Sequence, residues 1–288
     1  MAATQKAQKV SKSAAESVSG LPFPEYFSAL AAKYSQQTGN STRDSFAASL
    51  EDIVALAPIN KTSVIHDNAA GPGTATSVLV DNISAVDLPR ILITDNVPAM
   101  VAGARDSFGS IPTITAVEMD SLKLDFLDSH FTHSILNFSI FTMAEPLKCL
   151  QETYRTLRDG GVAALLTWRR FGAGEVIHAA QRLVRPDLMP MAIPNKEFMC
   201  EGVLAEMVVK AGFSEEKVKV LEKKVVVKGQ DLEGLKGFFL SDFTKPARNG
   251  WTEQEVAQWP EAIEQAVQDE ISREGGVLFE VWVVLATK

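Results

Sequence analysis

The sequence predicts an α/β protein built on a doubly wound, mostly parallel sheet, and two observations lead to this prediction. Five short runs rich in apolar and β-branched residues alternate with helical segments along the chain. The runs are continuously apolar, which is typical of parallel strands that helices cover on both faces. The five predicted strands are residues 62–66, 90–94, 113–117, 134–138 and 162–168.

The helices between these strands are predicted from the helical spacing of apolar residues and from the turns that bound them. A glycine-containing turn over residues 70–73 follows the first strand, and the turn at 159–161 precedes the fifth. The predicted helices run from the first turn to about residue 83, over 98–108, and from about 145 to 157.

The segments on either side of this core have different expected roles. Residues 1–20 are rich in Ala, Ser, Lys and Gln and lack an apolar stretch, so we expect a disordered tail without a secretory signal. Apolar residues at helical spacing over 25–33, and a second helix over 45–56, predict an N-terminal helical cap spanning residues 21–57.

The last third of the chain adds two more strands. Residues 201–210 are predicted to be helical, residues 231–274 largely helical, and two strands are expected over 218–227 and 277–286. These late strands predict an antiparallel addition that completes a seven-stranded sheet. We therefore expect a single domain over 21–288, with lid helices inserted at 172–210 and 229–275.

Composition restricts the kind of protein this is. Apolar residues make up 46% of the chain and charged residues 22%, which is enough for a large core. The formal net charge is -8, so we expect no nucleic-acid partner, and no apolar run approaches the length that spans a bilayer. Neither Cys149 nor Cys200 has the spacing of a disulfide framework or a metal site, so we expect no metal and a cytoplasmic location.

Acidic residues follow the first three predicted strands. Asp67 ends the first, Asp95 ends the second, and Asp120 follows the third. Ligands of open α/β sheets bind outside the carboxyl ends of the strands, where these side chains should meet. Gly71 and Gly73 would let the backbone approach such a ligand at the start of the next helix.

From these residues alone, Asp95 is placed to accept hydrogen bonds from ribose hydroxyls and Asp120 from an adenine amino group. Each position also has an ordinary alternative, because Asp after a strand often caps a helix and Gly-x-Gly often forms a turn. A nicotinamide cofactor is disfavoured because Thr76 occupies the third glycine position of that fingerprint. The joint spacing of the acids favours a nucleoside-containing ligand.

At these residues the chain resembles class I S-adenosylmethionine-dependent methyltransferases with a Rossmann-like fold, and most closely the fungal type that acts in secondary metabolism. The family's first glycine is replaced by Ala69, and Ala70 stands where Cys or Gly is usual. The segments that carry the resemblance are VIHDNAAGPGT (64–74), ITDN (93–96), EMDSL (118–122), LNFSIF (136–141), YRTLRDGG (154–161) and FEVWV (279–283).

The resemblance implies S-adenosyl-L-methionine as the cofactor and assigns its contacts. Asp67 and Gly71 would surround the methionine part, and Asp95 would bind the ribose. The remaining implied cofactor contacts are Asn68, Ala69 and Asn96 in the same loops, Met119, Asp120 and Ser121 at the adenine, Asn137 and Phe138 beneath the cofactor, and Tyr34 and Thr38 closing over its methionine end.

The acceptor site is predicted from aromatic residues in the segments expected to cover the cofactor. His178 follows the fifth strand and is the candidate general base, although a surface histidine on an amphipathic helix is the simpler alternative. The candidate acceptor-binding residues are Tyr26, Phe27, Trp168, Phe198 and Phe239. They predict a small apolar or aromatic acceptor, with O-methylation favoured.

Two other functions stay open at this point. A protein with this fold could bind the cofactor while catalysing a rearrangement or cyclisation, with the apolar pocket as a template. It could also be a binding module without catalytic activity. The sequence leaves open whether the protein forms a homodimer.

Overall fold

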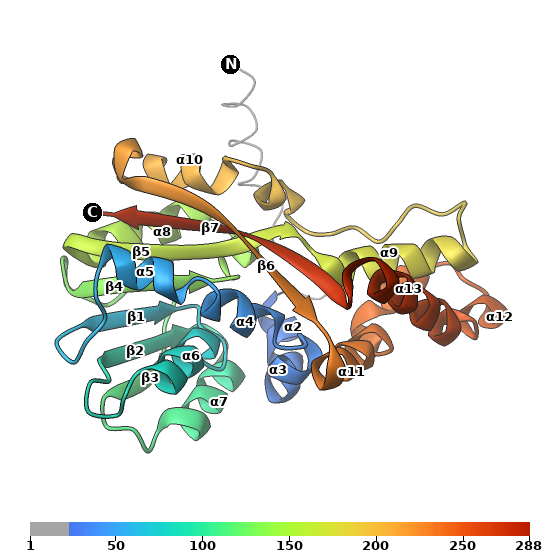
Figure 1. Cartoon of the computed structure of the whole chain (residues 1–288), viewed down its shortest axis with the longest axis horizontal. Helices are drawn as coiled ribbons and strands as arrows, with labels where there is room; N and C mark the ends of the chain where they lie inside the picture. Colours follow the sequence, from blue (N-terminus) through green and yellow to red (C-terminus); the bar gives the residue numbers. More distant parts are fainter. Residues whose placement is uncertain (1–22) are drawn as a thin grey trace.

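A computed structural model of the chain describes residues 23–288, and its centre is a seven-stranded sheet (Figure 1). The strand order is β3-β2-β1-β4-β5-β7-β6. Strands β1 to β5 pair in parallel, while β7 is antiparallel to both β5 and β6, which confirms the predicted mixed sheet. The strands are β1 (Val64–Asn68), β2 (Arg90–Asp95), β3 (Ile114–Glu118), β4 (Phe131–Asn137), β5 (Leu157–Arg170), β6 (Val218–Val227) and β7 (Val277–Thr287).

Helices cover both faces of this sheet, and the central strands show why their sequences are continuously apolar. In β5, Ala164 and Leu166 belong to one core cluster, whereas Ala163 and Leu165 belong to a second. Successive side chains of a strand point to opposite faces, so a strand covered on both sides buries every residue. The first cluster includes residues of α6 and α7, and the second includes residues of α8 and α10.

The helical elements follow the predicted pattern through the centre of the chain and are more broken at both ends. The α-helices are α2 (Phe23–Leu30), α3 (Tyr34–Gln37), α4 (Ser41–Ala47), α5 (Leu50–Leu56), α6 (Thr74–Asn82), α7 (Pro98–Phe108), α8 (Pro146–Thr156), α9 (Gly172–Val184), α10 (Val203–Lys210), α11 (Gly229–Phe239), α12 (Glu253–Val256) and α13 (Trp259–Glu274). The 3-10 turns are η2 (Ala31–Lys33), η3 (Ile140–Thr142), η4 (Lys196–Met199), η5 (Glu215–Lys217) and η6 (Asp242–Arg248).

Three boundaries differ from the sequence prediction. The helix expected over 45–56 is two helices, α4 and α5, and the segment 231–274 is divided among four elements. Strand β5 begins at Leu157, but its pairing with β4 shifts register around the glycine turn and becomes regular at Val162, where the strand was predicted to start. The predicted tail, residues 1–20, lies outside the described residues.

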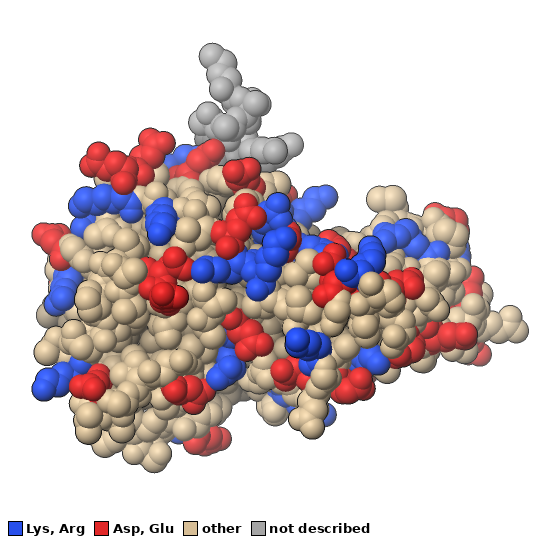
Figure 2. Space-filling view, in the orientation of Figure 1, with Lys and Arg blue, Asp and Glu red and all other residues tan. Residues whose placement is uncertain are grey.

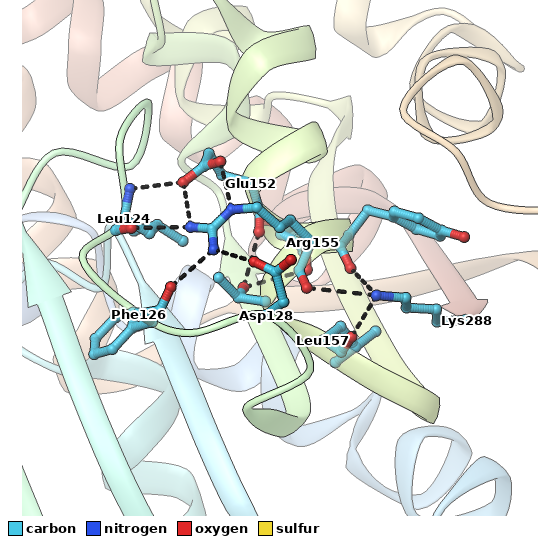
Figure 3. Close-up of polar contacts among 10 residues, drawn as sticks. Leu124, Phe126, Asp128, Glu152, Arg155, Leu157 and Lys288 are labelled. Atoms are coloured by element: carbon cyan, nitrogen blue, oxygen red, sulfur yellow. Dashed lines mark hydrogen bonds and ion pairs between the residues drawn. The ribbon is translucent and has the colours of Figure 1, made fainter.

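An arginine at the end of α8 anchors the loop that connects β3 to β4 (Figure 3). The Arg155 guanidinium donates to the carbonyl oxygens of Leu124 and Phe126 at 2.9 and 2.8 Å. Glu152 accepts from Arg155 at 2.7 Å and from the Leu124 N–H at 2.8 Å. A planar guanidinium can satisfy several acceptors at once, so this network orders the loop just beyond residues 120–122.

Lys288 holds the same helix at its carboxyl end (Figure 3). Its Nζ donates to the carbonyl oxygens of Tyr154 and Leu157, both at 2.8 Å, and lies 4.6 Å from the centre of the Tyr154 ring. A cation is favoured where the unpaired carbonyls of a helix end point. The end of β7 is therefore tied to the connection between α8 and β5.

Helices α9, α11, α12 and α13 form a lobe beyond the carboxyl end of β5 (Figure 1). The lobe meets the N-terminal helices closely at Gly234, where an added Cβ would lie 2.3 Å from the carbonyl oxygen of Gln36. The Asn40 amide donates to Asp231 at 2.8 Å across the same contact. By contrast, α10 lies within the predicted lid segment 172–210 but contacts α8 and the edge strands, so it covers the sheet.

On the face shown in Figure 2, acidic and basic side chains are interspersed. This distribution matches the mixed charge pattern of the sequence. No described helix is both long enough and apolar enough to cross a membrane.

Candidate functional site

A polar cavity of about 250 Å³ lies at the carboxyl ends of strands β1 to β4. Parallel strands bring these ends to one edge of the sheet, which is where the sequence predicted a site. The lining residues are Pro24, Phe27, Tyr34, Ala69, Ala70, Gly71, Thr74, Asp95, Asn96, Val97, Met100, Asp120, Ser121, Leu122, Asn137, Phe138, Ser139, Thr142, Met143 and Ala144.

Asp95 is the buried acid of this cavity. Its two carboxylate oxygens accept from the N–H groups of Gly71 and Val97 at 2.8 and 2.9 Å. Burial raises the pKa of Asp95, and these N–H groups oppose that change because they stabilise the charged form. The carboxylate is thus held in place with lone pairs left to accept bonds from a ligand.

Two residues predicted to contact the cofactor support the cavity from behind. Asp67 is fully buried and accepts from the N–H and the hydroxyl of Thr76 at 3.0 and 2.7 Å, at the first turn of α6. Asn68 accepts a 2.7 Å hydrogen bond from Ser121, which lines the cavity. Neither Asp67 nor Asn68 is a lining residue, because their side chains point into the sheet–helix junction.

The turn after β1 has the strained backbone that its glycines suggest. Ala69 has a φ of 48°, a left-handed conformation that a residue with a Cβ adopts at a cost. Gly73 has a φ of 86°, and a Cβ there would lie 2.6 Å from the Phe108 ring. Ala69 therefore tolerates a glycine conformation, and the turn survives the departure from the family pattern.

Several buried polar atoms of this cavity have no hydrogen-bond partner within the protein. Thr74 Oγ1, Asn137 Oδ1 and Ser139 Oγ all belong to lining residues. A buried polar atom without a partner costs about 1–3 kcal/mol, so such atoms are usually satisfied by a ligand or by water. Together with Asp95 they form a donor and acceptor set that fits a ribose and an amino-acid group.

A second cavity of about 150 Å³ has the opposite character. It lies between the N-terminal helices and the lobe, and its wall is mostly aromatic and aliphatic. The lining residues are Tyr26, Phe27, Leu30, Tyr34, Gln37, Thr38, Ser41, Thr42, Phe138, Phe141, Thr167, Trp168, Phe171, Ala173, Ile177, Met191, Ile193, Pro194, Asn195, Phe198, Met199, Leu235, Phe238 and Phe279.

The two cavities share three lining residues, Phe27, Tyr34 and Phe138. Phe138 follows β4 with a φ of 58°, which is uncommon for a bulky residue. Its ring stacks on Trp168 with the ring centres 3.9 Å apart. A ligand in the polar cavity and a ligand in the apolar one would therefore meet at these aromatic rings.

The apolar cavity offers little acid–base chemistry. No Asp, Glu, Lys, Arg or His side chain occurs among the described residues that line it. Its titratable groups are Tyr26 and Tyr34, and burial raises the pKa of both phenols, so both stay protonated near neutral pH. The cavity can position and desolvate a ligand, but it holds no strong base.

The structure brings together most of the residues predicted to bind a cofactor. Ten of the thirteen, counted from the lining residues given above, line at least one cavity, with Thr38 in the apolar one. The three that line neither are Asp67, Asn68 and Met119. Met119 uses its N–H to bond the carbonyl oxygen of Asp95 at 3.0 Å, and the next three residues form the cavity wall.

Two predicted acceptor-site residues are not at the cavity. Phe239 is fully buried in the lobe, and its helical neighbour Phe238 lines the cavity instead. His178 also lies outside both linings, with Nε2 2.8 Å from the carbonyl oxygen of Met191, whereas Ile177 faces the cavity. Adjacent residues of a helix point about 100° apart, so a one-residue error moves a side chain to another face.

The sequence analysis missed much of the apolar wall. Met191, Ile193 and Asn195 come from an irregular segment between α9 and η4, which has no periodicity to predict its orientation. Gln37 and Thr167 were also missed, since each is a single polar residue in an otherwise ordinary segment. Only the burial of their polar atoms distinguishes them.

The comparisons with known proteins agree with this geometry. Residues 66–165, from β1 to β5, match a family model described as a methyltransferase domain. No curated protein matches the sequence. Among solved structures, the [4+2]-cyclase SpnF is 15% identical with a TM-score of 0.53, over 96% of this chain and 98% of that chain.

Two further structures share the fold. A protein described as a methyltransferase from an antibiotic biosynthesis pathway of Anabaena variabilis is 15% identical with a TM-score of 0.52, over 83% of this chain and 96% of that chain. The MccD protein is 15% identical with a TM-score of 0.50, over the same shares. At these identities the likeness extends to the fold alone.

The buried carboxyl of Asp67 leads to a pH prediction. Burial raises its pKa to about 7, so the folded state binds the proton more tightly than the unfolded state does. The contribution of Asp67 to stability should therefore fall as pH rises from about 4 to about 7. Asp67→Asn resembles the protonated form, so its melting temperature should gain on that of the natural protein across this range.

The matched control for this experiment is Asp125→Asn, at an exposed position. Thermal unfolding of all three proteins at pH 4, 5.5 and 7 would measure the effect. A difference between Asp67→Asn and the natural protein that stays constant with pH would contradict the assignment.

Proposed function

We propose that this chain, which carries an S-adenosylmethionine-dependent methyltransferase domain, transfers a methyl group to a hydroxyl of a small apolar or aromatic metabolite. One observation carries the proposal: a polar cavity with a buried carboxylate and an apolar cavity meet at Phe27, Tyr34 and Phe138. A nucleoside-containing cofactor fits the first cavity, and an apolar acceptor fits the second.

In this proposal the polar cavity holds the cofactor along its length. Asp95 accepts from the ribose hydroxyls, while Asp120 and Ser121 contact the adenine. The turn at Gly71 and the amide of Asn137 contact the methionine part. Asp67 and Asn68 act indirectly, because they fix α6 and Ser121 around the ligand. When bound, the cofactor supplies an electrophilic methyl group on a positively charged sulfur.

The apolar cavity orients the acceptor and excludes water. Positioning and desolvation supply much of the rate acceleration in such a displacement. The acceptor hydroxyl loses its proton as its oxygen is methylated, and the described lining holds no carboxylate or imidazole to receive that proton. An acidic hydroxyl, such as a phenol or an enol, can release it to water at the cavity edge. We therefore do not assign His178 as the base.

We infer that the acceptor belongs to specialised metabolism. The Anabaena variabilis structure described above is assigned to an antibiotic biosynthesis pathway and shares this fold with a TM-score of 0.52. The extent of the aromatic wall also favours a ring-containing metabolite rather than a polar primary one.

A second candidate function is a cyclisation or rearrangement with the cofactor bound. Two observations favour it: the described lining of the apolar cavity has no general base, and the [4+2]-cyclase SpnF has the same fold with a TM-score of 0.53. In that case the apolar cavity would fold a flexible substrate, and the cofactor would not be consumed.

Incubating the purified protein with S-adenosylmethionine labelled in its methyl group would separate these functions. A panel of phenols and enols should accept the label if the protein is an O-methyltransferase, with one molecule of S-adenosylhomocysteine formed per product. Cyclisation of a polyene substrate without label transfer would support the second candidate. Absence of both label transfer and cofactor binding would contradict both.

The ribose assignment predicts that Asp95→Ala binds S-adenosylhomocysteine at least tenfold more weakly. Hydrogen bonds to a charged group contribute about 1.5–3 kcal/mol, and about 1.4 kcal/mol corresponds to a factor of ten. Isothermal titration calorimetry would measure the change, with Asp125→Ala as the exposed control.

Loss of the bonds to Gly71 and Val97 could also unfold the turn, so Asp95→Asn is a useful companion. It keeps the shape and one acceptor oxygen and should bind with intermediate affinity. Unchanged affinity in a folded Asp95→Ala protein would refute the assignment.

A further inference from the structure

Two polar groups interrupt the apolar cavity, and neither has a partner within the protein. Thr167 is 1% exposed, and its hydroxyl oxygen makes no hydrogen bond. The side-chain oxygen of Gln37 is buried and equally unpartnered. Both residues line the cavity. Because a buried unpaired polar group is costly, its presence in a native protein calls for an explanation, and a ligand is one.

Thr167 has no structural task that requires a hydroxyl. It lies in β5, where its backbone pairs with Trp282 of β7, and Val would fill the same position in a strand. The neighbouring Trp168 stacks on Phe138, at the boundary with the polar cavity. The unpaired hydroxyl therefore lies one residue along the strand from the proposed place of methyl transfer.

The cavity is also free of charge in the part of the chain that the structure describes. Moving an ionised ligand from water into such a wall without a counter-charge is strongly unfavourable. A neutral ligand with one or two hydrogen-bonding groups faces no such penalty, and it would satisfy the groups that the protein leaves unpaired.

We propose that Thr167 and Gln37 select an uncharged acceptor that carries a hydroxyl or carbonyl group. The inference rests on the proposed function, since it assigns the apolar cavity to the acceptor. It narrows the substrate class from apolar metabolites in general to neutral ring compounds such as phenols, enols and ketones. Carboxylic acids and amines that ionise near neutral pH are excluded.

Three probes with one ring system test the proposal: naphthalene, 2-naphthol and 2-naphthoate. At pH 7 the first two are uncharged and the third is an anion. Each is titrated by calorimetry into the full chain saturated with S-adenosylhomocysteine. We expect 2-naphthol to bind about three- to tenfold more tightly than naphthalene, as one hydrogen bond allows, and 2-naphthoate to bind most weakly.

Variants at Thr167 separate a binding role from a structural one. Thr167→Val should bind 2-naphthol no better than naphthalene, whereas Thr167→Ser should keep the preference. Without ligand, Thr167→Val should melt at the same or a higher temperature, because it removes an unpaired buried hydroxyl. Thr115→Val, at an exposed position of β3, is the matched control and should change nothing. Gln37→Leu should reduce the preference further.

Three results would overturn the proposal: 2-naphthoate binding as tightly as 2-naphthol, an unchanged preference in Thr167→Val, or failure of every probe to bind. The first titration, with S-adenosylhomocysteine alone, isolates the proposed function. If it produces no heat, the proposed function fails. If it does and the probe pattern is absent, only the acceptor inference fails.

Discussion

The boundary between the two cavities depends on the left-handed backbone of Phe138. Such a conformation costs of order 1–3 kcal/mol for a residue with a side chain, and it persists only where the surroundings enforce it. Here the Phe138 N–H donates to the carbonyl oxygen of Leu166 at 3.0 Å, and the ring is buried against Trp168. Strands β4 and β5 together hold the ring where the cavities meet.

The turn after β1 follows the same principle. Ala69 is also left-handed, and the next turn residue, Gly71, donates its N–H to the side chain of Asp95 from the neighbouring strand. Asp67 fixes the start of α6 from within the sheet. Strained backbone therefore occurs on both sides of the polar cavity, and each strained turn is tied to a buried strand. Local strain of this kind is typical of binding sites.

The sequence was sufficient for the sheet because the relevant patterns are local. Strand β6 and helix α7 have the predicted ends, and the acids Asp95 and Asp120 meet at one cavity because parallel strands end at one edge. Asp67 shares the spacing of these acids but turns inward to cap α6, and spacing alone cannot distinguish a capping carboxylate from a ligand-binding one.

The acceptor side could be predicted only in part. Tyr26, Phe27, Trp168 and Phe198 line the apolar cavity as expected, but Phe239 and His178 point away because helix rotation within the lobe depends on tertiary packing. The loop that carries Asn195 has no repeating pattern. Thr167 lies in an apolar run where a threonine is unremarkable, and its importance emerges only from its buried, unpaired hydroxyl.

The most direct test of this account is a crystal structure of the chain with S-adenosylhomocysteine bound. The account predicts that Asp95 contacts the ribose and that the sulfur atom faces the rings of Tyr34 and Phe138, open toward the apolar cavity. A nucleoside bound elsewhere, or a sulfur atom that faces away from this boundary, would contradict it.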